Sequence, residues 1–135
     1  MAKTINQKVV FKNTSPKILY SLYMNAKKHT ASTGAVAQIE ANEGSEFSAY
    51  DGYCTGANLK LVKDSLIVQS WRGSDWDESS PDSTLVLFFE AKGTDAVLHM
   101  THAGLPDEQA ESIAGGWHDF YWKPWKKYLL ENAGK

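Results

Sequence analysis

Two groups of residues in this chain have side chains suited to chemistry or to ligand binding. His102 ends a strand-like run, where an imidazole could orient a carboxylate or transfer a proton near neutral pH. Backbone hydrogen bonds beside the turn at Gly104 are the structural alternative for this histidine. Trp117 and Tyr121 lie one helical turn apart, so their rings could stack on a flat apolar ligand while the hydroxyl orients it. Ordinary core packing is the alternative for this pair.

Recognisable catalytic and metal-binding motifs are absent from the sequence. It contains no glycine-rich phosphate loop, no nucleophile elbow and no pair of histidines at helical spacing. His99 lies three strand positions before His102, so the two imidazoles point to opposite faces and cannot share one metal ion. The single cysteine, Cys54, can form neither an internal disulfide nor a thiolate metal site. We therefore predict no catalytic residue, no metal and no cofactor.

The segment that begins at Trp71 combines indoles with acidic residues. Its carboxylates, between residues 75 and 78, suggest a cation site, but the glycine and the terminal glutamate of a calcium-binding loop are missing. A solvated acidic loop is therefore the better interpretation. We expect Trp71 to line the interior of the protein and Trp76 to cover its rim, where an exposed indole would bind a protein partner.

Strand and turn signals follow one another along the chain in the order of an α+β fold. A strand over residues 4–11 precedes a helix that begins near Pro16 and a short second helix that ends near residue 34. Further strands are predicted over residues 35–40, 46–50, 53–62, 66–72, 84–91 and 96–101. Short connections favour antiparallel neighbours. A long amphipathic helix follows Pro106.

One face of this final helix is rich in aromatic residues. At about 100° per residue its inward members are Ala110, Ile113, Trp117, Phe120, Tyr121, Pro124 and Tyr128. Such a face must cover something, and the open face of the sheet is the natural candidate. Trp122 points about 140° away from Trp117, so it is either covered by the first strand or by loops, or exposed as a partner-binding residue. Pro124 predicts a kink.

Glycines interrupt the same helix at Gly115 and Gly116, each at a cost of about 1 kcal/mol relative to alanine. Such a cost indicates either close approach of the sheet backbone or space kept for a ligand.

Alternation within the strands identifies the side chains that share the inner face of the sheet with the final helix. The predicted ligand-binding residues are the inward side chains of three strands and of that helix: Gln69, Trp71, Leu87, Phe89, Met100, His102, Trp117, Phe120 and Tyr121. An inward Gln69 needs a polar partner, which a ligand or an ordered water would supply. Large side chains among these residues could fill the groove or form the walls of an open one.

Length, composition and charge bound the remaining possibilities. A chain of 135 residues, 42% hydrophobic and 22% charged, matches one ordinary folded domain over residues 1–135. Its formal charge of −2 argues against nucleic-acid binding, which needs a concentrated basic surface. The N-terminus has no signal-peptide core, and no apolar run is long enough to span a membrane. We therefore expect a cytoplasmic protein without nucleic-acid or membrane partners.

Several short motifs, in one order along the chain, resemble a known superfamily. They are AYDGY at residues 49–53, Trp71 and Arg72 followed by Trp76, THAGLP at residues 101–106, and GW…YWKP within residues 116–124. Together with the order of elements, they resemble the START-like (SRPBCC) superfamily. Within it, the sequence is most similar to the branch named for the activator of the ATPase of the ninety-kilodalton heat-shock chaperone. The resemblance spans essentially the whole chain.

This resemblance implies a helix-grip fold, in which a curved antiparallel sheet of about six or seven strands surrounds a long C-terminal helix. Superfamily relatives bind lipids, sterols, plant hormones or polyketide intermediates in the cavity between sheet and helix. Eukaryotic activators carry this domain behind a separate N-terminal domain, so the chain resembles the single-domain members of the branch.

Three functions are compatible with the resemblance. The first is a non-catalytic domain that binds a small apolar ligand in its cavity or a protein partner, in the response to stress. The second is a cofactor of a heat-shock-protein-ninety-type chaperone that acts by protein–protein contact, through an exposed surface near Trp76 and Trp122. The third is a polyketide-cyclase-like enzyme that uses His102 and Tyr121. The volume of the cavity distinguishes the first two, because a filled groove would favour protein contact.

Overall fold

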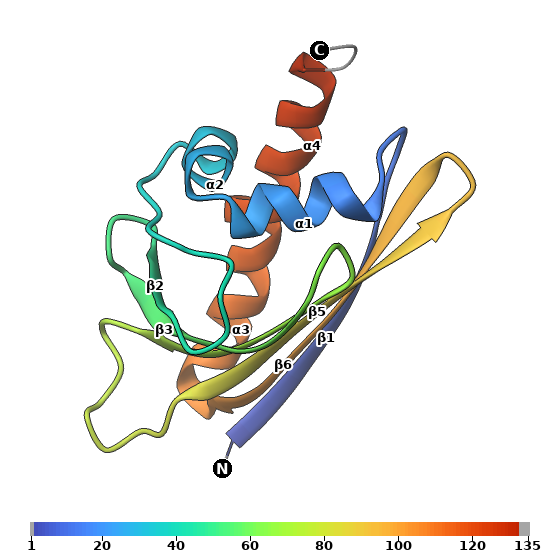
Figure 1. The fold of residues 1–135 in the computed structure, drawn as a ribbon. Coiled ribbons are helices and arrows are strands. Elements are labelled where there is room, and N and C mark those ends of the chain that lie inside the picture. The colour runs from blue at the N-terminus through green and yellow to red at the C-terminus, as the bar shows by residue number, and fades with distance from the viewer. Residues whose placement is uncertain (1, 133–135) are drawn as a thin grey trace.

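The computed structural model describes residues 2–132 of the chain as a curved sheet with helices on one side (Figure 1). In chain order the elements are β1 (Ala2–Phe11), α1 (Pro16–Met24), α2 (Ala26–Thr33), β2 (Glu46–Ala49), β3 (Cys54–Val62), β4 (Leu66–Gly73), β5 (Ser83–Lys92), β6 (Asp95–Pro106), α3 (Asp107–Trp117), η1 (His118–Trp122) and α4 (Lys123–Glu131). The segment η1 is a π-helical turn that joins α3 to α4 in one rod. No helix among the described residues is long and apolar enough to cross a bilayer.

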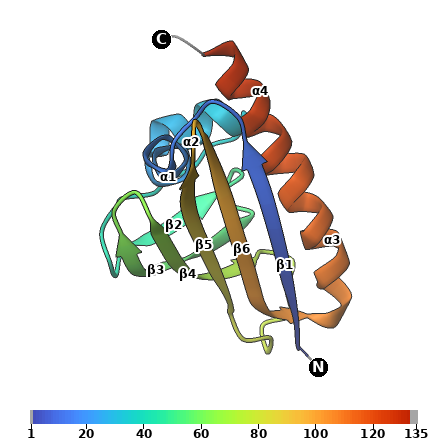
Figure 2. The same cartoon turned by 90° about the vertical axis from the view of Figure 1, so that its right-hand side faces the viewer.

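Six antiparallel strands form the sheet in the order β1-β6-β5-β4-β3-β2. From β2 to β6, strands that follow one another in the sequence are also neighbours in the sheet, whereas β1 pairs with β6. This pairing brings the start of the chain beside the strand that leads into the C-terminal rod, and Figure 2 shows α3 running next to β1. The α+β class, the antiparallel curved sheet and the long C-terminal helix predicted from sequence are confirmed.

The strand predicted over residues 35–40 is wrong. This segment forms an isolated bridge between Gln38 and Ser48 and no longer ladder. The alternation that suggested a strand is real, since Ala37 and Ile39 are both buried. The backbone carbonyls that follow the bridge accept hydrogen bonds from the Asn58 side-chain amide, including that of Glu40 at 2.8 Å, and not from the backbone of a neighbouring strand.

The inward rows predicted for the central strands are confirmed. They lie in register across β4, β5 and β6: Ile67, Gln69 and Trp71; Leu85, Leu87 and Phe89; Leu98, Met100 and His102. All nine side chains are buried, and each large apolar one contributes roughly 1.5–3 kcal/mol through its removal from water. Phe88 points to the opposite face of the sheet, where it is partly exposed. The register therefore assigns one face of the sheet to the rod and the other to solvent.

The π-helical turn changes which side chains of the rod face the sheet. In η1 the Lys123 N–H donates to the carbonyl of His118, five residues back, so side chains repeat near i+5 instead of i+4. Trp122 consequently stacks on Trp117, with 5.3 Å between the ring centroids, and is only 2% exposed. Phe120 moves outward and is 57% exposed. The predicted inward placement of Phe120 and the possible exposure of Trp122 are both wrong for this reason.

Trp122 is covered by β1, the alternative that the sequence left open. Its indole N–H donates to the Gln7 side chain at 2.7 Å, and its ring packs edge-on against Phe11. Gln7 also donates to the carbonyl of Ala114 in α3 at 2.9 Å. These contacts connect the edge strand of the sheet to the rod in α3 and at the end of the π-helical turn.

Pro124 is the second residue of α4, just after this turn, and it leaves one carbonyl of the rod without its helical donor. In an α-helix the carbonyl of Phe120 would accept from the N–H of residue 124, which proline lacks. The Tyr50 hydroxyl donates to that carbonyl instead. Tyr50, Asp51 and Gly52 all have positive φ, at 52°, 58° and 91°, in the turn between β2 and β3. A strained turn thus holds the tyrosine against the rod.

We expect Tyr50→Phe to lower the free energy of unfolding by about 1 kcal/mol, because it removes the donor to the Phe120 carbonyl. In a Pro124→Ala background the same substitution should cost clearly less, because a backbone N–H at position 124 can serve that carbonyl. Urea unfolding of the two single variants and the double variant measures this coupling. Tyr53→Phe is the matched control from the same turn and should show no coupling to position 124. Equal costs of Tyr50→Phe in both backgrounds would contradict the assignment.

Candidate functional site

A pocket of about 370 Å³ lies between the β2–β3 end of the sheet and the first part of the rod, partly open to solvent. Its wall is built by residues of the β2–β3 turn, the two strands that follow it, α3 and η1: Tyr50, Tyr53, Cys54, Trp71, Ser112, Ile113, Gly116, Trp117, Phe120 and Tyr121. Most of this surface is aromatic. Gly116 faces the pocket without a side chain, and a Cβ built there would meet only the Phe120 ring, at 3.6 Å.

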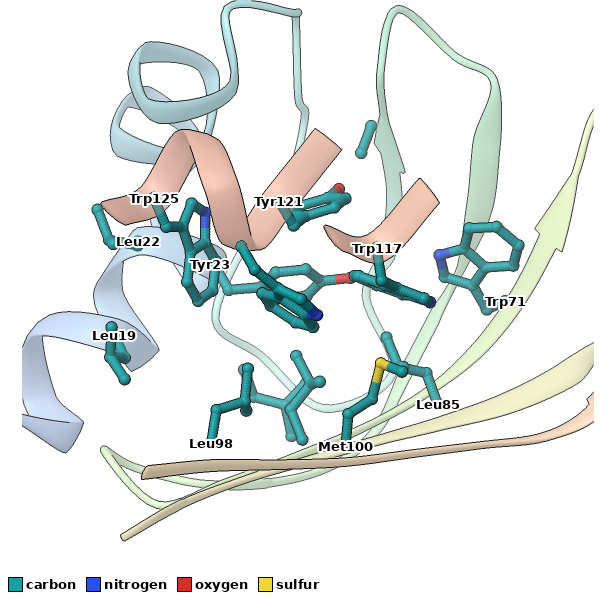
Figure 3. Close-up of a cluster of buried hydrophobic side chains, with 14 of the residues drawn as sticks. Leu19, Leu22, Tyr23, Trp71, Leu85, Leu98, Met100, Trp117, Tyr121 and Trp125 are labelled. Atoms are coloured by element: carbon teal, nitrogen blue, oxygen red, sulfur yellow. The ribbon is translucent and has the colours of Figure 1, made fainter. Parts of the chain in front are cut away.

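Four of the predicted ligand-binding residues line this pocket: Trp71, Trp117, Phe120 and Tyr121. The other five, Gln69, Leu87, Phe89, Met100 and His102, are buried in the packed part of the groove instead. Figure 3 shows Met100 and Leu98 directly below the aromatic side chains of the rod. The sequence left open whether the groove is filled or open; these buried side chains fill its central part, and the pocket lies at the β2–β3 end. Ligand contact by the four lining residues stays a prediction.

His102 is held in a chain of hydrogen bonds. Trp117 donates its indole N–H to Nδ1 of His102 at 3.1 Å, so this nitrogen carries no proton. Nε2 therefore donates to the Ser83 hydroxyl at 2.8 Å, and Ser83 donates in turn to the Trp71 carbonyl at 2.6 Å. Both imidazole nitrogens are occupied, and burial lowers the pKa of His102 from 6.5 to about 3. His102 is thus a hydrogen-bonded structural residue, but its partners are the side chains of Trp117 and Ser83 and not the backbone beside Gly104 that the alternative named.

Gln69 has the polar partners that its burial requires, and both come from the protein. The Tyr23 hydroxyl donates to its carbonyl oxygen at 2.9 Å, and its amide donates to Asn58 at 2.8 Å. Asn58 continues the chain to the backbone of residues 40 and 42. Helix α1, two strands and the loop before β2 are therefore joined through one buried polar chain. A ligand or water is not needed to satisfy Gln69.

His29 is a buried residue that sequence reasoning missed. Its Nδ1 lies 2.8 Å from the Tyr23 carbonyl, which can only accept, so Nδ1 is protonated and Nε2 accepts from the Tyr121 hydroxyl at 2.8 Å. Burial lowers the pKa of His29 from 6.5 to about 4. The α2 sequence AKKHTAST is polar and buries only His29 and Ser32, so no hydrophobic period marked this histidine.

Comparison with known proteins identifies the family. Residues 13–129 match the family model described as activator of Hsp90 ATPase homolog 1-like protein. The chain belongs to this family. The human activator of 90 kDa heat shock protein ATPase homolog 1 is 33% identical over 110 residues, which are 82% of this chain and 32% of that protein. The corresponding Dictyostelium discoideum activator homologue is 31% identical over 116 residues, or 85% of this chain and 30% of that protein. The chain thus spans about a third of the length of these relatives.

Two solved structures share the fold. An HSP90 activator from Plasmodium falciparum superposes with a TM-score of 0.82 at 24% identity and covers 96% of both chains. The Aha1 dimer from Colwellia psychrerythraea superposes with a TM-score of 0.76 at 17% identity, over 98% of this chain and 99% of that chain. The predicted START-like fold and its activator branch are therefore confirmed.

The two indoles predicted as partner-binding residues of this Aha1-like domain are buried. Trp76, like Trp122, is less than a tenth exposed, at 7%. It packs on Trp71, with ring centroids 5.7 Å apart, while the Arg72 guanidinium lies over its ring. Arg72 also pairs with Asp82 at 2.6 Å and donates to the carbonyl of Asp77. These bonds fold the acidic loop back on the sheet and explain why Trp76 lies under it instead of projecting from it.

Charged and nucleophilic groups are scarce at the pocket of this Aha1-like domain. Cys54 lies in its wall, where burial raises the pKa of the thiol to about 12, so it is neither a thiolate nor a nucleophile at neutral pH. Over residues 2–132, no group of three or more His, Cys, Asp and Glu side chains could hold a metal ion.

The two buried histidines predict acid sensitivity. Their folded pKa values, about 4 for His29 and about 3 for His102, lie below the ordinary 6.5, so the unfolded chain takes up protons first as the pH falls. The contribution of these neutral histidines to the free energy of unfolding is complete above pH 7. It is lost progressively as the pH falls below about 6.5. We expect unfolding at pH 5.5 to take up about two protons through these residues.

Urea unfolding between pH 5 and 7.5 measures this proton uptake as the slope of the unfolding free energy against pH. The slope gives the number of protons taken up on unfolding. That number should fall by about one in His29→Gln, by about one in His102→Gln, and by about two in the double variant. An unchanged slope in both single variants would show that neither histidine is kept neutral by the fold.

Proposed function

We propose that this chain is a non-catalytic START-like domain that binds a small apolar ligand in the pocket between the β2–β3 turn and the rod. The pocket itself is the observation that supports this function. Its volume of about 370 Å³ lies within the range of small-molecule sites, roughly 300–1,000 Å³. Apolar and aromatic walls of this kind bind ligands mainly through removal of apolar surface from water.

The contacts of the reactive side chains argue against catalysis at this site. His102 does not line the pocket, and both of its nitrogens are bonded to protein groups. The Tyr121 hydroxyl donates to His29, and burial raises the pKa of Tyr121 well above 10. A cyclase-like reaction through these two residues would require an acid or base that reaches the substrate. Neither residue offers one in this arrangement.

Gly116 provides a direct test of ligand binding. Gly116→Leu would place a side chain in the pocket, whereas Gly115, its neighbour on α3, is exposed and does not line it. Both substitutions remove a helical glycine and should stabilise the free protein by up to about 1 kcal/mol. We expect Gly116→Leu to abolish binding of the uncharged dye N-phenyl-1-naphthylamine, measured by its fluorescence. Gly115→Leu should bind like the unsubstituted protein, and equal binding by both variants would place the dye elsewhere.

A second candidate is a cofactor of an Hsp90-type chaperone, which family membership specifically favours. The human relative at 33% identity is named an activator of the 90 kDa heat shock protein ATPase. A protein partner would find exposed aromatic side chains at the mouth of the pocket, where Tyr53 is 38% and Phe120 57% exposed. This rim is the proposed contact surface, in place of the surface near Trp76 and Trp122. A cytoplasmic location and a role in stress belong to the same proposal.

The turnover of an Hsp90-type chaperone, measured with and without saturating amounts of this protein, tests the second candidate. We expect an increase in ATP hydrolysis that Phe120→Glu largely removes, because a buried carboxylate at the contact is costly. Phe88→Glu is the matched control, since Phe88 is 41% exposed on the opposite face of the sheet. Unchanged turnover at saturation would exclude this function for the chain.

A further inference from the structure

The wall of the pocket carries no formal charge. Among its described lining residues there is no lysine, arginine, aspartate or glutamate. Its titratable groups are cysteine and tyrosines, and burial raises the pKa of Tyr50, Tyr53 and Cys54 to about 12 in each case. His102 lies directly behind the wall, with its ring centroid 4.9 Å from that of Trp71, and it is neutral as well. At neutral pH a ligand in this pocket therefore meets uncharged groups.

A charged side chain that interacts with this wall, Asp75, is an anion. Burial raises the pKa of Tyr53, and the Asp75 carboxylate raises it further. An anionic ligand would lose its hydration in the pocket without gaining a cationic partner, and it would approach Asp75. Carboxylates and sulfonates are therefore disfavoured.

Trp71 adds a polar requirement to this apolar site. Its side chain is 5% exposed, and its indole N–H has no acceptor among the described residues. Figure 3 shows the nitrogen-bearing edge of this indole turned toward Trp117, the neighbouring wall of the pocket. A buried donor without a partner is costly, and a ligand that supplies an acceptor would recover that cost. A quaternary ammonium would suit the ring faces, but it would leave this donor unpaired.

The rings of the wall also constrain the shape of the ligand. Trp117 is tilted against Tyr121 by 38° at 4.7 Å and against Trp71 by 41° at 6.2 Å. These inclined planes present faces and edges to a flat molecule, the arrangement that aromatic pairs prefer.

We propose that the pocket selects an uncharged, flat aromatic molecule with one hydrogen-bond acceptor, and that Trp71 donates to this acceptor. The inference rests on the proposed ligand-binding function and specifies its ligand class.

Four naphthalene probes of matched size test the proposal by calorimetric titration at pH 7.5. They are 2-acetylnaphthalene (neutral, with an acceptor), 2-ethylnaphthalene (neutral, without one), 2-naphthoate (anionic) and (2-naphthylmethyl)trimethylammonium (cationic). We expect 2-acetylnaphthalene to bind most tightly, roughly fivefold better than 2-ethylnaphthalene. The anion should bind at least about tenfold more weakly than 2-acetylnaphthalene.

Two tryptophan variants locate the donor. Trp71→Phe keeps an aromatic ring but removes the N–H, so the preference for 2-acetylnaphthalene over 2-ethylnaphthalene should fall to about one. Trp76→Phe is the matched control, because the Trp76 N–H is also buried without a partner among the described residues but Trp76 does not line the pocket. It should keep the preference.

The outcomes separate this inference from the function on which it rests. Equal or tighter binding of 2-naphthoate or of the ammonium probe overturns the inference while leaving a ligand-binding pocket. Equal binding of the two neutral probes to the unsubstituted protein overturns the role of Trp71 without reference to any variant. Absence of binding by all four probes overturns the proposed ligand-binding function itself, and the inference with it.

Discussion

The π-helical turn in the C-terminal rod is the constraint on which the interior of this protein depends. One extra residue in that turn brings Trp122 onto the same side as Trp117, and the following turn of α4 adds Trp125, which is fully buried. Without the extra residue, ideal helical spacing would direct Trp122 about 140° away from Trp117 and place Phe120 inward. The rod therefore meets the sheet through three indoles. Their shapes determine where the groove is filled and where a pocket remains.

Hydrogen bonds between buried side chains connect elements of this aromatic interior that are far apart in the sequence. The Tyr121 hydroxyl bonds to His29 of α2, while Trp117 bonds to His102 of β6. Each histidine uses both ring nitrogens in its neutral form, which is why burial of the imidazoles is compatible with stability. Directional bonds at these two residues, like those from Gln7 and Tyr50, position the rod in addition to non-directional apolar packing.

The pocket and the filled part of the groove have different consequences for function. Side chains such as Leu87 and Met100 fill the central part of the groove, and the pocket lies at the β2–β3 end. There Gly116 leaves room, and the exposed rings of Tyr53 and Phe120 lie at the mouth. The same mouth carries exposed aromatic surface, so ligand binding and contact with a chaperone would involve one region.

Local patterns in the sequence were sufficient to predict the α+β class, the inward rows of β4, β5 and β6, and the covering helix. Alternation, turn residues and helical periodicity are properties of neighbouring residues, and they do not depend on distant partners. The placement of Trp122 and Phe120 could not be read in this way, because a π-helical turn alters the period that the prediction assumes. His29 gave no periodic signal at all, since its partners, Tyr23 and Tyr121, come from two other helical segments. Whether the groove is open or filled depends on how much of its volume is occupied by side chains from elements far apart in the sequence. Only the tertiary structure determines how those side chains meet.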